Sequence, residues 1–304
     1  MFKSKTSLIC SLTVFFGLPS VSTFAQPQPV IQILATFDYP GAGNSTTAIG
    51  INDRDDIVGF YVDSGGVTRG FVRASNGTFS LPIVEPRDTG NFTRCEGINN
   101  SGTVSGDFFN VAENAFHGYF LSGGTFTQFD VGPSFSTSLV GINVAGNFVG
   151  TFGNVAQPNR AFINIGGTTV VIAIPGAYDS YGNGINTQNE VVGSYSDSSL
   201  VYHGFFRAAG GTLKFPIDFP GSASTLLGGM NDRNAIVGSY TDNSGGVHGL
   251  LLHKPNTFVS FDYPGAVATS LNSINKAGHI SGRYTDGLGV RHGFMAAVIA
   301  PPVD

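Results

Sequence analysis

The chain has no tryptophan, only two cysteines among its 304 residues, and a charged fraction of just 12%. One cysteine, Cys10, falls in an N-terminal segment that we expect to be removed, which leaves Cys95 alone and excludes an internal disulfide. The formal net charge of −5 becomes −7 without that segment and its two lysines. This acidic balance argues against nucleic acid or an anionic membrane as a partner.

Common catalytic signatures are missing as well. Neither a Gly-x-Ser-x-Gly nucleophile motif nor a His-Glu-x-x-His zinc motif occurs, and no stretch has the apolar periodicity of a long helix. The chain has instead 43 glycines and 26 phenylalanines, a composition suited to tight turns and to aromatic packing between sheets. We therefore expect an all-β protein, and we predict no catalytic residue, no metal and no cofactor.

Residues 1–25 have the pattern of a signal peptide. Lys3 and Lys5 precede a short apolar run, and Thr23-Phe24-Ala25 has the small-x-small form of a cleavage site. An uncleaved membrane anchor is the alternative, but the apolar run is short and poorly flanked for that role. We expect a secreted protein, extracellular or periplasmic, with residues 26–299 as a single domain and residues 300–304 as a frayed, proline-rich tail.

A repeated unit dominates the rest of the sequence. Each copy is centred on a large apolar residue followed by asparagine, and successive asparagines are 43 to 47 residues apart. Glycine follows the asparagine by seven residues, an aromatic residue by nine, and Asp or Asn by eleven. A fixed period of this length is the sign of a repeat architecture. The central asparagines are Asn52, Asn99, Asn143, Asn186, Asn231 and Asn275.

Within each unit the spacing is that of short strands. Ile280, Gly282 and Tyr284 alternate on one face of an extended segment, and pairs such as Asn76-Gly77 favour two-residue hairpin turns. Each unit therefore reads as four antiparallel strands, the fourth ending in a Phe-Asp-Tyr-Pro-Gly type motif. Four strands per 40–50 residues are typical of a propeller blade, so the sequence predicts a six-bladed β-propeller.

The two ends of the repeat array complement each other. Residues 30–39 form a strand of the fourth type with no partners before it, whereas the last unit, residues 275–295, has no fourth strand. We expect the N-terminal strand to complete the last blade and close the ring, which removes the exposed sheet edges of an open array. One connection is irregular: residues 81–97 have lost the Pro-Gly motif and are unusually charged.

The motif order resembles that of the HAF-type extracellular repeat proteins, a secreted bacterial repeat family. The signature tripeptide occurs as His203-Gly204-Phe205 and as His292-Gly293-Phe294, while Leu250 replaces its phenylalanine after His248. The resemblance covers nearly all of the chain after residue 25. It implies a secreted, propeller-like protein, and it implies no activity, because no catalytic residue is established for the family.

Paired aspartate and histidine residues are the most suggestive candidate site. Histidine follows aspartate by six residues in three units, and Asp63 with Arg69 is a variant of the pair. A ring of such pairs could bind a sugar or a metal, although each unit supplies only one histidine and a metal needs convergent ligands. The alternative is a cross-strand hydrogen bond that fixes the turn, and the recurrence of the pair with the fold favours it. The candidate binding residues are Asp63, Asp197, His203, Asp242, His248, Asp286 and His292.

Other candidates have a structural interpretation that we favour. The repeated asparagines suit turn entrances, where the side chain bonds its own backbone two residues on. Asp88 and Glu96 could supply a glycosidase-like carboxyl pair, but we favour a solvated charged loop. Arg94 would lower the pKa of the Cys95 thiol, yet no histidine is near, so Cys95 reads as a small buried residue.

These observations predict a secreted, non-enzymatic propeller that acts as a binding or scaffold module, and we expect a monomer. A glycan or a protein is the expected ligand, at the face that bears the Asp-His turns. The alternative is a polysaccharide-active hydrolase or lyase with its site at the central channel.

Overall fold

The computed structural model describes residues 28–132, 136–154, 156–253 and 257–299, and the structural statements below concern those residues. The predicted signal peptide, residues 1–25, and the predicted tail, residues 300–304, lie outside them. No helix of the described residues is long and apolar enough to span a membrane.

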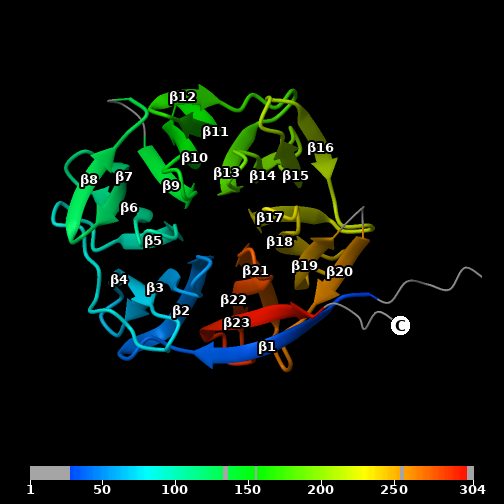
Figure 1. The fold of residues 1–304 in the computed structure, drawn as a ribbon, viewed down its shortest axis with the longest axis horizontal. Coiled ribbons are helices and arrows are strands. Elements are labelled where there is room, and N and C mark those ends of the chain that lie inside the picture. Colours follow the sequence, from blue (N-terminus) through cyan, green and yellow to red (C-terminus); the bar gives the residue numbers. More distant parts are fainter. Residues whose placement is uncertain (1–27, 133–135, 155, 254–256, 300–304) are drawn as a thin grey trace, which may run out of the picture.

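The expectation of an all-β protein is confirmed, since every regular element of the described residues is a strand. The sheets are arranged around a common centre (Figure 1). Three of them have four antiparallel strands each, in the orders β5-β6-β7-β8, β12-β11-β10-β9 and β13-β14-β15-β16. Their strands are β5 (Thr93–Ile98), β6 (Val104–Asn110), β7 (Ala115–Ser122), β8 (Thr125–Phe129), β9 (Ser136–Ile142), β10 (Phe148–Asn154), β11 (Gln157–Ile165), β12 (Thr168–Val171), β13 (Asp179–Ile185), β14 (Val191–Ser196), β15 (Tyr202–Arg207) and β16 (Leu213–Ile217).

The remaining strands form one eleven-stranded sheet. Inside it, antiparallel groups meet through single parallel residue pairs, Val247 with Ala268 between β19 and β21, and Ser45 with Arg291 between β2 and β23. Its strands are β1 (Val30–Phe37), β2 (Ala42–Ile51), β3 (Ile57–Asp63), β4 (Thr68–Arg73), β17 (Ser224–Met230), β18 (Ile236–Thr241), β19 (Val247–His253), β20 (Thr257–Phe261), β21 (Ala268–Ile274), β22 (His279–Thr285) and β23 (Arg291–Ile299).

The predicted pairing between the two ends of the chain is confirmed. Strand β1 runs antiparallel to β23, from Val30 opposite Ile299 to Phe37 opposite Gly293. Figure 1 shows the blue and red strands side by side. The N-terminal strand therefore covers the edge that β23 would otherwise expose.

The prediction of four strands in every unit is wrong for the first unit. After β4 the chain makes only isolated bridges back to that strand, between Arg73 and Phe79, Gly70 and Ile83, and Thr68 and Phe92. Pro82 and Pro86 interrupt this segment, and neither can donate a backbone hydrogen bond to a ladder. The irregular connection seen in the sequence therefore replaces a regular fourth strand.

The repeated glycine of the second strand allows neighbouring strands to approach closely. A Cβ atom on Gly193 would lie 2.0 Å from the backbone oxygen of Tyr181, and one on Gly238 would lie 2.0 Å from that of Leu226. Such a contact is far inside van der Waals distance, so no other residue fits without backbone movement. Close packing of strands accounts for this part of the repeat signature.

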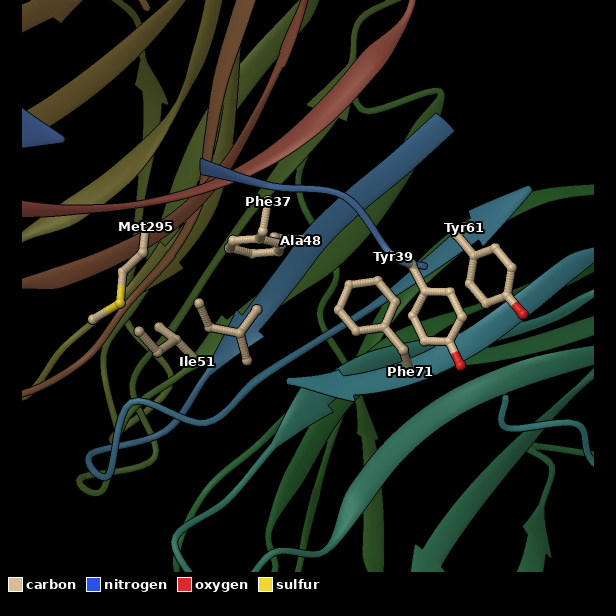
Figure 2. Packing of buried hydrophobic residues seen from close by; sticks show 8 residues of the cluster. Phe37, Tyr39, Ala48, Ile51, Tyr61, Phe71 and Met295 are labelled. Atoms are coloured by element: carbon tan, nitrogen blue, oxygen red, sulfur yellow. The ribbon is translucent and has the colours of Figure 1, made fainter. Parts of the chain in front are cut away.

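Aromatic side chains fill the space between the sheets. Tyr39, just after β1, stacks on Tyr61 with ring centroids 4.0 Å apart and an interplanar angle of 9°, and Phe71 packs beside them (Figure 2). The same stack recurs between Tyr263 and Tyr284, at 3.7 Å and 3°. The tyrosine of the Phe-Asp-Tyr-Pro-Gly motif thus meets the aromatic residue nine positions after the repeated asparagine.

Candidate functional site

The repeated asparagines hold turns and also tie neighbouring units together. In Asn231, the Oδ1 atom accepts hydrogen bonds from the backbone N–H groups of Arg233 at 3.0 Å and Ala235 at 3.1 Å. Its Nδ2 atom donates to the backbone oxygen of Asn275, 3.0 Å away in the next unit. The predicted turn role is confirmed, and the bond between units is an addition that the turn pattern alone did not indicate.

This link between units repeats around the molecule, and we call it the asparagine belt. The Nδ2 atom donates to the backbone oxygen of the next central asparagine from Asn52, Asn99, Asn143, Asn231 and Asn275. The bond from Asn275 returns to Asn52, across 223 positions of sequence. Asn186 differs, because its Nδ2 atom donates to the Glu190 carboxylate. All six central asparagines line the space at the centre of the sheets.

Each Asp-His pair is part of a three-residue arrangement, which we call a histidine clamp. In His248, Nε2 lies 3.2 Å from the Asp242 carboxylate of the turn, and Nδ1 lies 2.8 Å from Asp262 of the motif that follows the fourth strand. His203 lies between Asp197 and Asp218, and His292 between Asp286 and Asp38. A fourth clamp places His117 between Glu113 and Asp130.

The turn aspartates are held by the backbone as well. Asp286 accepts hydrogen bonds from the N–H groups of Leu288 and Val290, and the hydrogen bond from Val290 is the largest cause of its lowered pKa. Burial disfavours protonated His292, but the carboxylates of Asp38 and Asp286 outweigh it and raise its pKa. In this clamp the two carboxylates therefore favour the imidazolium form of His292.

The contacts of the seven candidate binding residues follow one pattern. Each aspartate accepts backbone hydrogen bonds in its turn, and each histidine has both ring nitrogens facing a carboxylate. Asp63 pairs with Arg69 at 3.1 Å, as the variant pair predicted. These contacts support the turn-fixing interpretation, whereas a binding role for the seven residues stays a prediction.

Sequence reasoning missed the second carboxylate of every clamp. Asp218 follows His203 by 15 residues and Asp262 follows His248 by 14, so the recurrence was present in the sequence. The partner of His292 is Asp38, which lies 254 positions earlier and reaches it only through the pairing of β1 with β23. A search restricted to residues around one turn does not find such partners.

A cavity of about 740 Å³ lies at the centre of the sheets. Every unit contributes its first strand to the lining, through residues 49–53, 96–100, 140–144, 183–187, 226–232 and 270–276. Several polar groups in it have no partner among the described residues, namely the Oδ1 atoms of Asn183 and Asn272, whose amide nitrogens donate to backbone oxygens, and the hydroxyls of Ser239 and Ser270.

A group of charged side chains lies where the wall of this cavity meets a second cavity, which Arg94 and Asp107 line. Arg94 donates to both oxygens of Asp107, at 2.9 and 2.6 Å, and its Nε lies 3.1 Å from Glu96. Burial raises the pKa of Glu96 to about 7, although the Arg94 guanidinium opposes the shift. Glu96 and Arg283 both line the cavity, and Glu96 also faces a second cavity of about 330 Å³ beside it.

Arg283 has no such carboxylate partner. No carboxylate oxygen of the described residues lies within 4.0 Å of its guanidinium. Burial lowers its pKa, and the nearby guanidinium of Arg291 lowers it further, against the opposite effect of Glu96. The cavity thus contains a cation whose charge the surrounding side chains leave largely uncompensated.

Three smaller expectations have clear outcomes. Cys95 is buried, as expected, and burial raises its thiol pKa to about 12, so the expected lowering by Arg94 is wrong. Asp88 accepts hydrogen bonds from Gly90, Phe92 and Thr93 within its loop and lines neither described cavity, so it is not paired with Glu96 there. Within the part of the chain that the structure covers, no cluster of three or more His, Cys, Asp or Glu side chains is arranged to hold a metal ion.

Comparisons with known proteins identify the fold but no family. No family model matches the sequence, and no curated protein matches it. Among solved structures, a variant of AofleA from Arthrobotrys oligospora is 12% identical and aligns over 94% of this chain and 93% of its own, with a TM-score of 0.55.

Two further structures show the range of functions among similar folds. A variant of the Aleuria aurantia lectin in complex with Fucalpha1-6GlcNAc is 12% identical over 85% of this chain and 97% of its own, with a TM-score of 0.54. An inactive variant of virginiamycin B lyase from Staphylococcus aureus with quinupristin is 11% identical over 90% and 100%, with a TM-score of 0.51. At such identities the likeness shows the fold alone, and the chain is therefore an all-β, propeller-like protein.

Proposed function

We propose that this chain is a secreted, non-enzymatic propeller that binds a glycan in its central cavity. The observation that carries the proposal is the set of amide oxygens and hydroxyls in that cavity that the fold leaves without partners. Such groups are suited to the hydroxyls of a sugar, and the cavity volume is within the range of small-ligand sites. A lectin is among the proteins of similar fold.

Six blades form part of the proposal. The asparagine belt links neighbouring units in five of six places and returns from Asn275 to Asn52. The eleven-stranded sheet is joined internally by single parallel residue pairs, which supports treating it as three neighbouring blades that touch at their corners. Six first strands around one cavity agree with the same count.

Secretion and membership of the HAF-type repeat family are proposed on the sequence. The signal-peptide pattern of residues 1–25 and the repeated His-Gly-Phe signature support them. Expression of the full chain in a bacterial host, followed by N-terminal sequencing of the exported protein, tests cleavage after Ala25. Retention of the whole chain in the cytoplasm would contradict it.

Binding is tested with the purified chain on a glycan array, followed by titration calorimetry of the best ligand. The double variant Ser239→Ala, Ser270→Ala should weaken binding and leave the melting temperature unchanged, because neither hydroxyl has a partner in the fold. Ser64→Ala, in an exposed turn, is the matched control. Loss of binding in Asp242→Ala but not in the double variant would place the ligand at the histidine clamps instead.

An enzyme is the second candidate, favoured by one observation. Glu96 is a buried carboxyl in the cavity with a pKa raised to about 7, which suits general acid–base catalysis near neutral pH. Incubation of the chain with polysaccharides would reveal reducing ends or unsaturated products. Turnover that disappears in Glu96→Gln would replace the binding proposal with a hydrolase or lyase.

A further inference from the structure

The central cavity contains one feature that a site for a neutral sugar does not require. Arg283 of β22 lines it without a carboxylate partner among the described residues, whereas Arg94, which lines the second cavity beside it, binds two carboxylates. The position is not part of the repeat signature. Eight residues after the repeated asparagine, the other units have Phe60, Asp107, Thr151, Ser194 and Ser239.

A second arginine increases the positive charge at this place. Arg291 at the start of β23 is close enough to Arg283 to lower its pKa, and it too has no carboxylate of the described residues within 4.0 Å. Two buried or half-buried guanidinium groups repel each other, and leaving one uncompensated is costly unless an opposite charge arrives. Glu96 is the acid whose charge raises the pKa of Arg283, but its carboxylate already pairs with Arg94, whose Nε lies 3.1 Å away.

We propose that the ligand of the central cavity is an acidic sugar whose anionic group pairs with Arg283. This inference rests on the proposed function and specifies its ligand class. A carboxylate or a sulfate ester on the sugar ring would accept hydrogen bonds from the Arg283 guanidinium, and the positive charge of Arg291 would add electrostatic attraction. The ring hydroxyls would donate to the Oδ1 atoms of Asn183 and Asn272, which line the same cavity and have no described partner.

The raised pKa of Glu96, which burial causes, gives the proposed site a pH dependence. A carboxyl with a pKa near 7 is partly protonated at neutral pH, so it can donate a hydrogen bond to an anionic ligand instead of repelling it. Binding should therefore strengthen as the pH falls from 8 to 6. A neutral sugar would have little reason to show this dependence through Glu96.

The test uses the purified full chain and three matched oligosaccharides: a neutral one, its uronic acid counterpart and its sulfated counterpart. Titration calorimetry should show tighter binding of one or both acidic ligands, with affinity falling as salt rises. Arg283→Gln should reduce acidic-ligand affinity about tenfold to a hundredfold, the usual effect of losing a charge-assisted hydrogen bond. Arg207→Gln, on β15 and outside both cavities, removes the same charge and should bind normally.

The possible outcomes distinguish the acidic-ligand proposal from the glycan-binding function on which it rests. Equal binding of neutral and acidic ligands, unaffected by Arg283→Gln, would overturn the acidic ligand and leave the glycan-binding function standing. No binding of any sugar would overturn both. A melting temperature of Arg283→Gln equal to or above that of the wild type supports a ligand role, whereas a strong loss of stability with unchanged affinity would assign Arg283 to the fold.

Discussion

The asparagine belt makes a quantitative prediction about stability. Replacing Asn231 with alanine removes three hydrogen bonds: two that its Oδ1 atom accepts from turn amides, and one that its Nδ2 atom donates to Asn275 of the next unit. The side chain is only 5% exposed, so water replaces these partners poorly. At about 1 kcal/mol for each bond, with a further penalty for the turn N–H groups of Arg233 and Ala235 that lose their acceptor, the loss should be about 2–4 kcal/mol.

Asn76→Ala is the matched control, because Asn76 also holds a turn. Its Oδ1 atom accepts hydrogen bonds from the backbone and the hydroxyl of Thr78, but the turn is exposed and no bond leads to another unit. We expect a loss below about 1 kcal/mol for this variant. Urea denaturation followed by circular dichroism measures both, with the m-value as a check that the transition is unchanged. Equal losses in the two variants would refute the idea that the belt stabilises the ring.

Two other predictions concern the repeat signature. Gly238→Ala should prevent folding or lower the free energy of unfolding by several kcal/mol, because the new Cβ would collide with the backbone oxygen of Leu226. Gly210→Ala is the control, since its Cβ meets open space and the change should be nearly neutral. Soluble yield and melting temperature measure both variants. His292 has a raised folded pKa, so its stabilising effect is complete below its unfolded pKa, about 6.5, and is lost as the pH rises through the raised value. Asp286 has a lowered folded pKa, so its effect is present above about 3.8 and is lost as the pH falls through the lowered value. Stability measured from pH 2 to 9 should therefore be highest between these limits in the wild type, and His292→Gln should reduce the decline on the alkaline side, to which His248 also contributes because Asp262 and Asp242 raise its pKa against the effect of burial.

Much of the fold was predictable because the repeat signature describes local structure. The seven-residue spacing from asparagine to glycine specifies a turn followed by a crowded strand, and both are found at Gly193 and Gly238. The irregular fourth strand after β4 was indicated only as a charged, motif-poor connection, since its loss follows from prolines in one copy. Structure that recurs in several units can be predicted from the repeated pattern, whereas a departure within one unit, such as the lost fourth strand, becomes evident only in the three-dimensional structure.

The candidate site was less predictable for the same reason. The repeated Asp-His pairs attracted attention, yet their partners within the fold account for their contacts. The groups that line the cavity unpaired among the described residues, such as the Asn272 Oδ1 atom, or that have no carboxylate partner there, such as Arg283, occur at positions that vary between units and carry no motif. Sequence periodicity identifies what the fold needs, and the residues it does not explain become apparent only when the strands are placed around one cavity.

The pairing of β1 with β23 has a consequence for biosynthesis. Because Val30 must meet Ile299, the last sheet stays incomplete until almost the whole chain has been synthesised. A product truncated before Arg291 would leave both β1 and the edge of β22 without partners, and such edges pair readily with other chains. Incomplete translation should therefore yield molecules that aggregate, whereas in the full-length chain β1 covers the edge of β23.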